Sequence, residues 1–139
     1  SFRTVFVFDS GTGGRRQKLN IPAGWVSAVQ LPPDGSQLAV AADDNILRIW
    51  NVSTWEEKPS LVVTPVDRLT ALDFDFRGTY LALGGNNGKV VVWNRITNVL
   101  VIPQDQLGAP VTALTFSPDN TQLLVGYANG IVRVWDFEE

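Results

Sequence analysis

The chain has 139 residues and a net charge of −3, which gives no basic footprint for nucleic acid or for a membrane surface. It contains no Cys and no His, and this excludes disulfides, Ser-His and Cys-His catalytic pairs and most zinc sites. A hydrophobic content of 45% is typical of a folded domain, and the longest apolar run, 38–42, is far too short to span a membrane.

The predicted elements are strands throughout. The chain opens with an apolar strand at 5–9 and continues, after a glycine-rich loop, with a less regular strand at 17–21. A unit of strand, turn, strand, tight turn, strand and looser link to a fourth strand then follows. Its first three strands fall at 26–31, 37–40 and 47–51, then at 69–74, 80–83 and 90–94, and finally at 111–116, 122–125 and 132–136. No segment shows the apolar period of a helix, so we expect an all-β protein.

Aromatic residues mark the end of every third strand. Phe8, Trp50, Trp93 and Trp135 recur at a period of about 42 residues, and each is followed by Asn or Asp. The tight turns before these strands are Asp44-Asn45, Asn87-Gly88 and Asn129-Gly130. Asn-Gly between two apolar runs predicts a type I′ hairpin turn with positive φ at both residues.

This pattern resembles the WD-repeat β-propeller family. The resemblance rests on four strands per unit, on the turn Ser117-Pro118-Asp119 and on Trp135-Asp136 at the end of a third strand. It implies a partial propeller of antiparallel four-stranded blades with strands a to d, about three and a quarter blades in all. Residues 1–25 would supply strands c and d of a first blade, 26–68 and 69–110 a second and third, and 111–139 strands a to c of a fourth.

The chain departs from the family pattern in two ways. It lacks the Gly-His dipeptide before strand a, and only Asp44 matches the family's buried Asp in the b–c turn. The family's network of His, Asp and Trp therefore has no equivalent, and we expect apolar stacking to hold the blades together.

The strand inventory leaves both end blades incomplete, with apolar faces and edges that invite association. Two copies that shared one blade would bring one strand c too many. We favour completion by the rest of a longer chain, with self-association or another subunit as the alternative.

Two carboxylates, Asp73 and Asp75, alternate along a strand a and so point to the same side. They are the best candidates for acid–base or metal chemistry. The competing interpretation is that strand a lines a wet central channel, where Gln30 and Thr115 occupy the position of Asp73.

By resemblance, the d–a and b–c loops form the partner-binding face. The residues they contribute are Trp25, Asp43, Asp44, Asp67, Arg68, Asn86, Asn87, Tyr127 and Asn129. An aromatic residue, an arginine and short polar side chains suit a protein or peptide partner.

We therefore expect a non-catalytic interaction or scaffolding module without metal or cofactor and, since nothing marks secretion, a cytoplasmic one. The alternatives are a structural or regulatory sensing segment of a larger signalling protein, or a propeller enzyme that uses Asp73 and Asp75.

Overall fold

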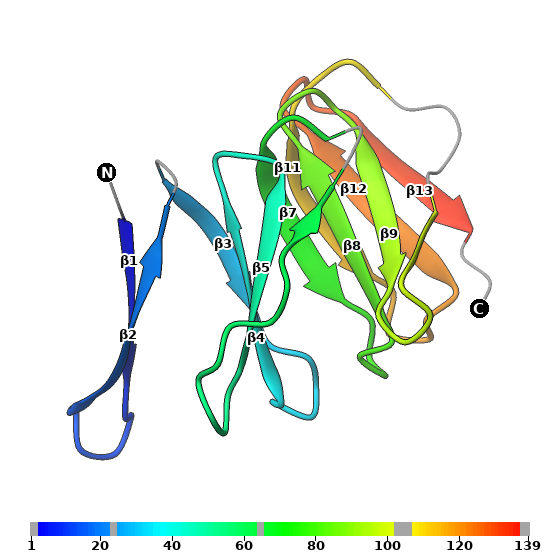
Figure 1. The fold of residues 1–139 in the computed structure, drawn as a ribbon. Coiled ribbons are helices and arrows are strands. Elements are labelled where there is room, and N and C mark those ends of the chain that lie inside the picture. The colour runs from blue at the N-terminus through cyan, green and yellow to red at the C-terminus, as the bar shows by residue number, and fades with distance from the viewer. Residues whose placement is uncertain (1–2, 23–24, 64–65, 102–106, 137–139) are drawn as a thin grey trace.

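The computed structural model describes residues 3–22, 25–63, 66–101 and 107–136, and over these ranges it contains β-strands and no helix (Figure 1). The all-β prediction is confirmed. The strands are β1 (Arg3–Phe8), β2 (Arg15–Ile21), β3 (Val26–Gln30), β4 (Gln37–Ala42), β5 (Ile46–Asn51), β6 (Leu61–Val62), β7 (Leu69–Phe74), β8 (Tyr80–Gly85), β9 (Val90–Asn94), β10 (Val99–Val101), β11 (Val111–Phe116), β12 (Gln122–Tyr127) and β13 (Val132–Asp136).

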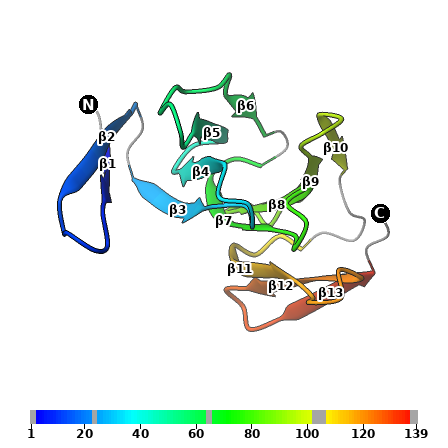
Figure 2. The same ribbon diagram turned by 90° about the horizontal axis from the view of Figure 1, so that it is seen from below.

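The strands form four antiparallel sheets in which chain neighbours pair. We call them blade 1 (β1–β2), blade 2 (β3–β6), blade 3 (β7–β10) and blade 4 (β11–β13). Figure 2 shows the blades following one another in chain order around an open arc. The strands β3, β7 and β11 are strands a, and those of successive blades lie side by side.

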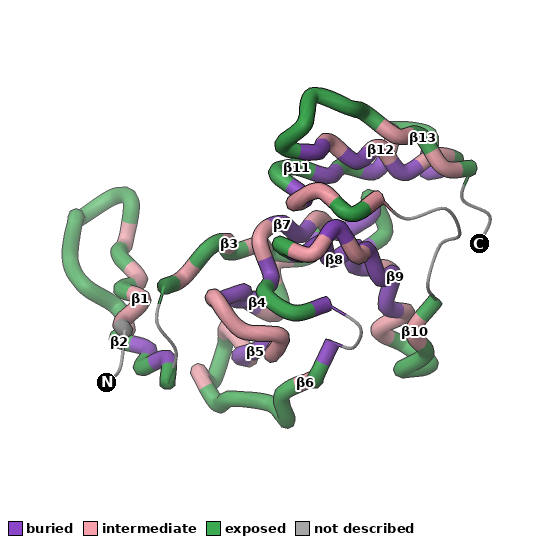
Figure 3. The backbone as a smooth tube through the Cα atoms, turned by 90° about the horizontal axis from the view of Figure 1, so that it is seen from above, coloured by how far each residue is buried: buried purple, intermediate pink, exposed green. Residues whose placement is uncertain are grey.

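The middle strands of blades 2 and 3 are buried on both faces. Residues 38–42 of β4 and 81–85 of β8 are buried without interruption, as Figure 3 shows. Each of these blades has a neighbour on both sides, so both faces of its strands lose contact with water. In β12 buried and half-buried residues alternate, because only one face of blade 4 is covered.

Each junction between blades has its own apolar cluster. Trp50 lies in the cluster between blades 1 and 2, Trp93 in that between blades 2 and 3, and Phe116 in that between blades 3 and 4. Burial of this apolar surface is the main favourable contribution to the fold.

Apolar stacking is not the whole account, because a hydroxyl bridge repeats at two junctions. The Ser27 hydroxyl donates to the Leu69 carbonyl at 2.6 Å, and the Thr70 hydroxyl donates to the Val111 carbonyl at 2.5 Å. Both bonds join the strands a of successive blades. The prediction that the blades are held mainly by apolar contacts omitted these bonds.

The type I′ prediction for the tight turns is wrong. Gly88 and Gly130 have φ of 82° and 87°, but neither Asn87 nor Asn129 has positive φ. The amide of Gly88 donates to the Gly85 carbonyl at 3.1 Å, which closes a turn that ends on the glycine. Such longer hairpin loops place one left-handed residue after an ordinary turn, so only the glycine needs its conformational freedom.

In the described part of the chain, no helix has the length and apolar character needed to cross a membrane.

Candidate interaction face

The b–c turns and the loops before strand a meet at one end of the blades. In blade 2 the amide of Asp43 donates to the Trp25 carbonyl at 2.8 Å. In blade 3 the amide of Asn86 donates to the Arg68 carbonyl at 2.9 Å, and in blade 4 the amide of Ala128 donates to the Pro110 carbonyl at 2.8 Å. One backbone bond therefore fixes the same pair of loops in three successive blades. We call this end the loop face.

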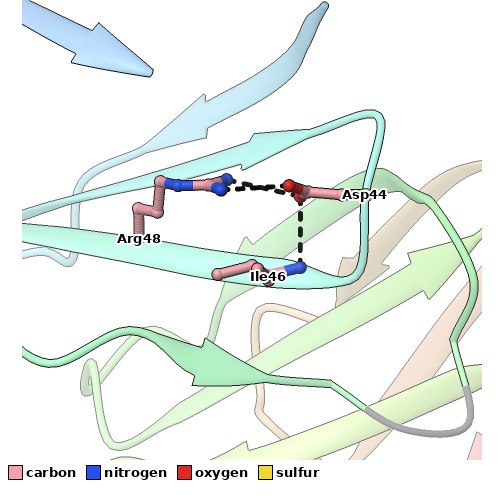
Figure 4. Close-up of polar contacts among 3 residues, drawn as sticks. All are labelled: Asp44, Ile46 and Arg48. Atoms are coloured by element: carbon pink, nitrogen blue, oxygen red, sulfur yellow. Dashed lines mark hydrogen bonds and ion pairs between the residues drawn. The ribbon is translucent and has the colours of Figure 1, made fainter. Parts of the chain in front are cut away.

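Asp44 on this face is committed to an internal ion pair (Figure 4). Its Oδ2 lies 3.0 Å from Nη2 of Arg48, and its Oδ1 accepts the amide of Ile46 at 3.2 Å. The Arg48 side chain is only 5% exposed, and a buried guanidinium without a carboxylate partner is strongly unfavourable. An arginine within an otherwise apolar strand c was the sequence signal for this pair, and our sequence analysis missed it.

Three of the candidate residues on the loop face make the same local bond. The side-chain oxygens of Asn87 and Asn129 accept the amides of Lys89 and Ile131 at 3.2 Å, as Asp44 accepts that of Ile46. These bonds stabilise the turn itself. Turn chemistry thus accounts for the residue type at this position in blades 2, 3 and 4.

Asp67 joins the two loops of blade 3. Its Oδ1 accepts the amide of Arg68 at 2.7 Å and the amide of Asn87 at 3.0 Å. A carboxylate in the loop before strand a therefore ties down the b–c turn without any histidine. Asp67 is nevertheless exposed at the surface of the loop face.

The most exposed large apolar side chain on the loop face belongs to Trp25, of which 67% is accessible. Arg68 occupies the equivalent position in blade 3 and is exposed, as are Asn86 and Asn129, while Asp43 is half-buried. Because β3 and β7 lie side by side, Trp25 and Arg68 precede neighbouring strands at the loop-face end of blades 2 and 3.

Tyr127 is a correction to the predicted face. Its side chain is 4% exposed and packs in the apolar cluster between blades 3 and 4, where burial raises the pKa of its hydroxyl. It is the last residue of β12, and only its backbone takes part in the turn, where its carbonyl accepts the amide of Gly130. Its counterparts one repeat apart, Ala42 and Gly85, are also buried strand ends, and this alignment could have identified it.

The two candidate channel carboxylates both bind blade 4. Asp73 Oδ2 accepts the Phe116 amide at 3.1 Å and the Thr115 hydroxyl at 3.3 Å. Burial raises the pKa of the Asp73 carboxyl above its ordinary value, although these two hydrogen bonds act in the opposite direction.

Asp75 is 1% exposed, which is not the environment of a wet channel. Its Oδ2 accepts the side-chain amide of Asn120 at 3.0 Å, and its Oδ1 accepts the amide of Tyr80 at 3.0 Å. The two carboxylates thus point to the same side, as expected, but Oδ2 of each accepts a hydrogen bond across the junction between blades 3 and 4. Among the described residues, no three acidic side chains gather closely enough to hold a metal ion.

The family model described as WD domain, G-beta repeat matches the chain at 15–51, 61–94 and 101–136. Each matched stretch begins near a strand d and ends on strand c of the next blade, so the sequence repeat is offset by one strand from the sheets.

The chain spans only about a third or less of the length of the curated relatives described here, although each match covers most of the chain itself. Target of rapamycin complex subunit LST8 of Mus musculus is 24% identical over 115 residues, which are 81% of this chain and 35% of that protein. Small ribosomal subunit protein RACK1 of Candida albicans is 26% identical over 81% of this chain and 37% of its own length. Protein ROOT INITIATION DEFECTIVE 3 of Arabidopsis thaliana is 32% identical over 72% of this chain and 22% of its own.

Proposed function

Because the chain belongs to the WD domain, G-beta repeat family, we propose that it is a non-catalytic interaction module that binds a protein or peptide on its loop face. Two relatives carry names that place them in assemblies, one as a subunit of the target of rapamycin complex and one as a small ribosomal subunit protein. These names support a role in holding proteins together. The residues on the surface of this chain determine which partner it binds.

One observation carries the choice of surface. Trp25 and Arg68 stand at the same position of neighbouring blades, both side chains are exposed, and turn geometry explains neither residue type. Tryptophan and arginine dominate binding energies at protein interfaces, since each covers a large area and also donates hydrogen bonds. Asn86 and Asp67 add exposed short polar side chains beside Arg68, which suits the rim of an interface.

The carboxylates Asp73 and Asp75 support the non-catalytic part of the proposal. A general acid or base must reach a substrate proton, but Oδ2 of each residue accepts a hydrogen bond from blade 4. The cytoplasmic location expected from the sequence belongs to the same proposal, and fractionation of cells that produce the protein tests it.

The test begins with affinity capture of a partner, followed by measurement of its dissociation constant with purified chains. Trp25→Ala and Arg68→Ala should each weaken binding by about 1–2 kcal/mol or more, a factor of about 5 to 30. The matched controls are Phe76→Ala and Arg77→Ala, an exposed aromatic residue and an exposed arginine in the a–b turn of blade 3, at the opposite end of the sheets. Normal binding by the first pair together with weak binding by the second would show that the wrong face was chosen.

A further inference from the structure

Arg68 differs from the other arginines of blades 2 and 3 because its guanidinium binds no other described residue. The guanidinium groups of Arg48, Arg77 and Arg95 interact with an aspartate, a phenylalanine ring and a glutamine, respectively. Arg68 makes hydrogen bonds through its backbone alone, and the residue is exposed. A planar group with several N–H donors is therefore open to solvent on the loop face.

The backbone that carries this guanidinium is held in place by hydrogen bonds. The Arg68 amide donates to Asp67 Oδ1 at 2.7 Å, and the Arg68 carbonyl accepts the amide of Asn86 at 2.9 Å. The same Asp67 oxygen accepts the amide of Asn87 at 3.0 Å. Blade 3 has a neighbouring blade on each side, so these surroundings lie wholly inside the chain. A preorganised backbone lowers the entropy that is lost when the side chain binds a partner.

The charges of the loop face that are open to a partner are positive. Lys89 follows the b–c turn of blade 3, and its ammonium group, like the guanidinium of Arg68, has no partner among the described residues. The carboxylates are in use, because Asp44 belongs to an ion pair and Asp67 accepts two backbone amides. Asp43 is half-buried. An anionic group is therefore the complement that this face favours.

A carboxylate fits the site better than a phosphate. The guanidinium fork binds a carboxylate through two parallel hydrogen bonds. A phosphorylated side chain carries about two negative charges and is usually held by a cluster of arginines. In the described part of blades 2 and 3 the only open guanidinium is that of Arg68, and the Asp67 carboxylate beside it repels a dianion more strongly than a single charge.

Two neighbours of Arg68 add contacts of other kinds. Asn86 is exposed, and its side-chain amide, which bonds to no described residue, can donate to or accept from the backbone of a bound segment. Trp25 on the preceding blade offers a large apolar surface, since 67% of it is accessible. The site thus combines a cation, a backbone-binding amide and an apolar surface.

We propose that the partner binds the loop face through an acidic segment, in which an Asp or Glu carboxylate pairs with the guanidinium of Arg68 and a nearby apolar side chain packs on Trp25. This proposal rests on the proposed function, because it names the chemistry of the partner for the same face. Lys89 attracts the segment from the rim of the site, and added salt weakens that attraction.

The experiment is selection of peptides from a random display library on the purified chain, followed by fluorescence anisotropy with labelled copies of the selected peptides. Asp or Glu close to an apolar residue should be enriched. Arg68→Gln should weaken binding of these peptides at least about 10-fold, because it removes both charge-assisted bonds. Lys89→Gln should weaken it about two-fold. Arg77→Gln is the matched control at the opposite end of blade 3 and should bind as wild type does.

A reversal of charge makes the test specific. Arg68→Glu should lose the acidic peptides and should bind versions of them in which lysine replaces the acidic residue. A variant that merely fails to fold cannot exchange one preference for the other, and circular dichroism checks the fold directly. A version with phosphoserine in place of the acidic residue should bind more weakly than the acidic peptide.

Several results would overturn the proposal: a library that yields no binding peptide, enrichment of basic or purely apolar peptides, equal binding by Arg68→Gln, or tighter binding of the phosphoserine version. Trp25→Ala and Arg68→Ala separate this failure from failure of the proposed function. If both weaken binding of non-acidic peptides, the loop face stands and only the chemistry of the partner is wrong. If both bind every selected peptide as wild type does, the choice of face is wrong as well.

Discussion

The junction between blades 3 and 4 and the open face of blade 4 present the same repeat positions in two surroundings. Val90 and Val92 on β9 are fully or almost fully buried, while Val132 and Val134 on β13 are more than half exposed. The sequences and the pairing within the two sheets are alike. Burial in this fold therefore comes from the neighbouring blade. The loss of stability caused by a substitution should depend on whether a neighbouring blade covers the substituted position.

The largest difference is expected at the glycines that end two b–c turns. Gly88 and Gly130 have nearly equal positive φ, so alanine at either site costs about 1–2 kcal/mol of backbone strain. A Cβ on Gly88 would also lie 2.7 Å from the Ala109 carbonyl oxygen, whereas at Gly130 nothing lies within 4 Å. Gly88→Ala should therefore lower the free energy of unfolding in urea by about 3 kcal/mol or more in all. Equal losses for the two variants would mean that the loop before β11 gives way at little cost.

A second pair of glycines isolates the packing of side chains. A Cβ on Gly84 would lie 2.5 Å from Val111 Cγ1 and 3.0 Å from Leu114 Cδ2, but the nearest atoms to one on Gly126 are 3.8 Å away. Gly84→Ala should cost about 1–3 kcal/mol of stability through overpacking. Gly126→Ala should be neutral or stabilise the fold by up to about 1 kcal/mol, since alanine suits a strand better. Urea midpoints measure both, and a large loss for Gly126→Ala would show that the open face is covered in solution.

The hydroxyl bridge gives a smaller contrast. The Thr70 hydroxyl contacts the Gly84 carbonyl of its own sheet and also donates to the Val111 carbonyl of the next blade, whereas the bond of the Thr112 hydroxyl, 3.3 Å from the Gly126 carbonyl, lies within its own sheet. Thr70→Val should cost about 1 kcal/mol, the usual net value of one hydrogen bond, and Thr112→Val only a few tenths. Thermal unfolding of the two variants checks the ranking. The reverse order would imply that Thr112 has a partner outside this chain.

The smallest effect concerns pH. The pKa of Asp73 is raised in the folded protein, so its contribution to stability is present at low pH and is lost as pH rises through that raised pKa. Asp73→Asn should therefore gain stability relative to wild type over the same rise in pH. Asp119 is the opposite case, because hydrogen bonds from Ser117 and Thr121 lower its pKa, so Asp119→Asn should lose stability relative to wild type. Urea titrations across the acid range test the two signs, and a shared sign would contradict the account.

The strands and their order could be predicted because the repeat makes each unit evidence for the others. The a–b turns repeat as well, since Gly35, Gly78 and Asn120 all have positive φ and each donates its amide to the carbonyl three residues earlier. The type I′ prediction failed because Asn-Gly fits two loop types, and only the backbone bond to Gly85 or Tyr127 distinguishes them.

The loop face was harder to predict, because its composition does not show which side chains are already in use. Asp44 is bound to Arg48, Asp67 holds two amides, and Tyr127 continues β12 into the core. The bond from Asn87 to Asp67 and the burial of Tyr127 depend on contacts between distant segments or blades, whereas Asp44 and Arg48 are only four residues apart. Trp25 and Arg68 stay candidates because both are exposed and turn geometry explains neither residue type.

The central claim is that a neighbouring blade, and not the sheet itself, protects each strand. Native-state hydrogen exchange tests it most directly at β8 and β12, since each is paired on both edges within its sheet while only β8 is covered on both faces. At a dilution that keeps the chain monomeric, the amides of β8 should exchange at least about 10-fold more slowly than those of β12. Equal protection of the two strands would contradict the claim.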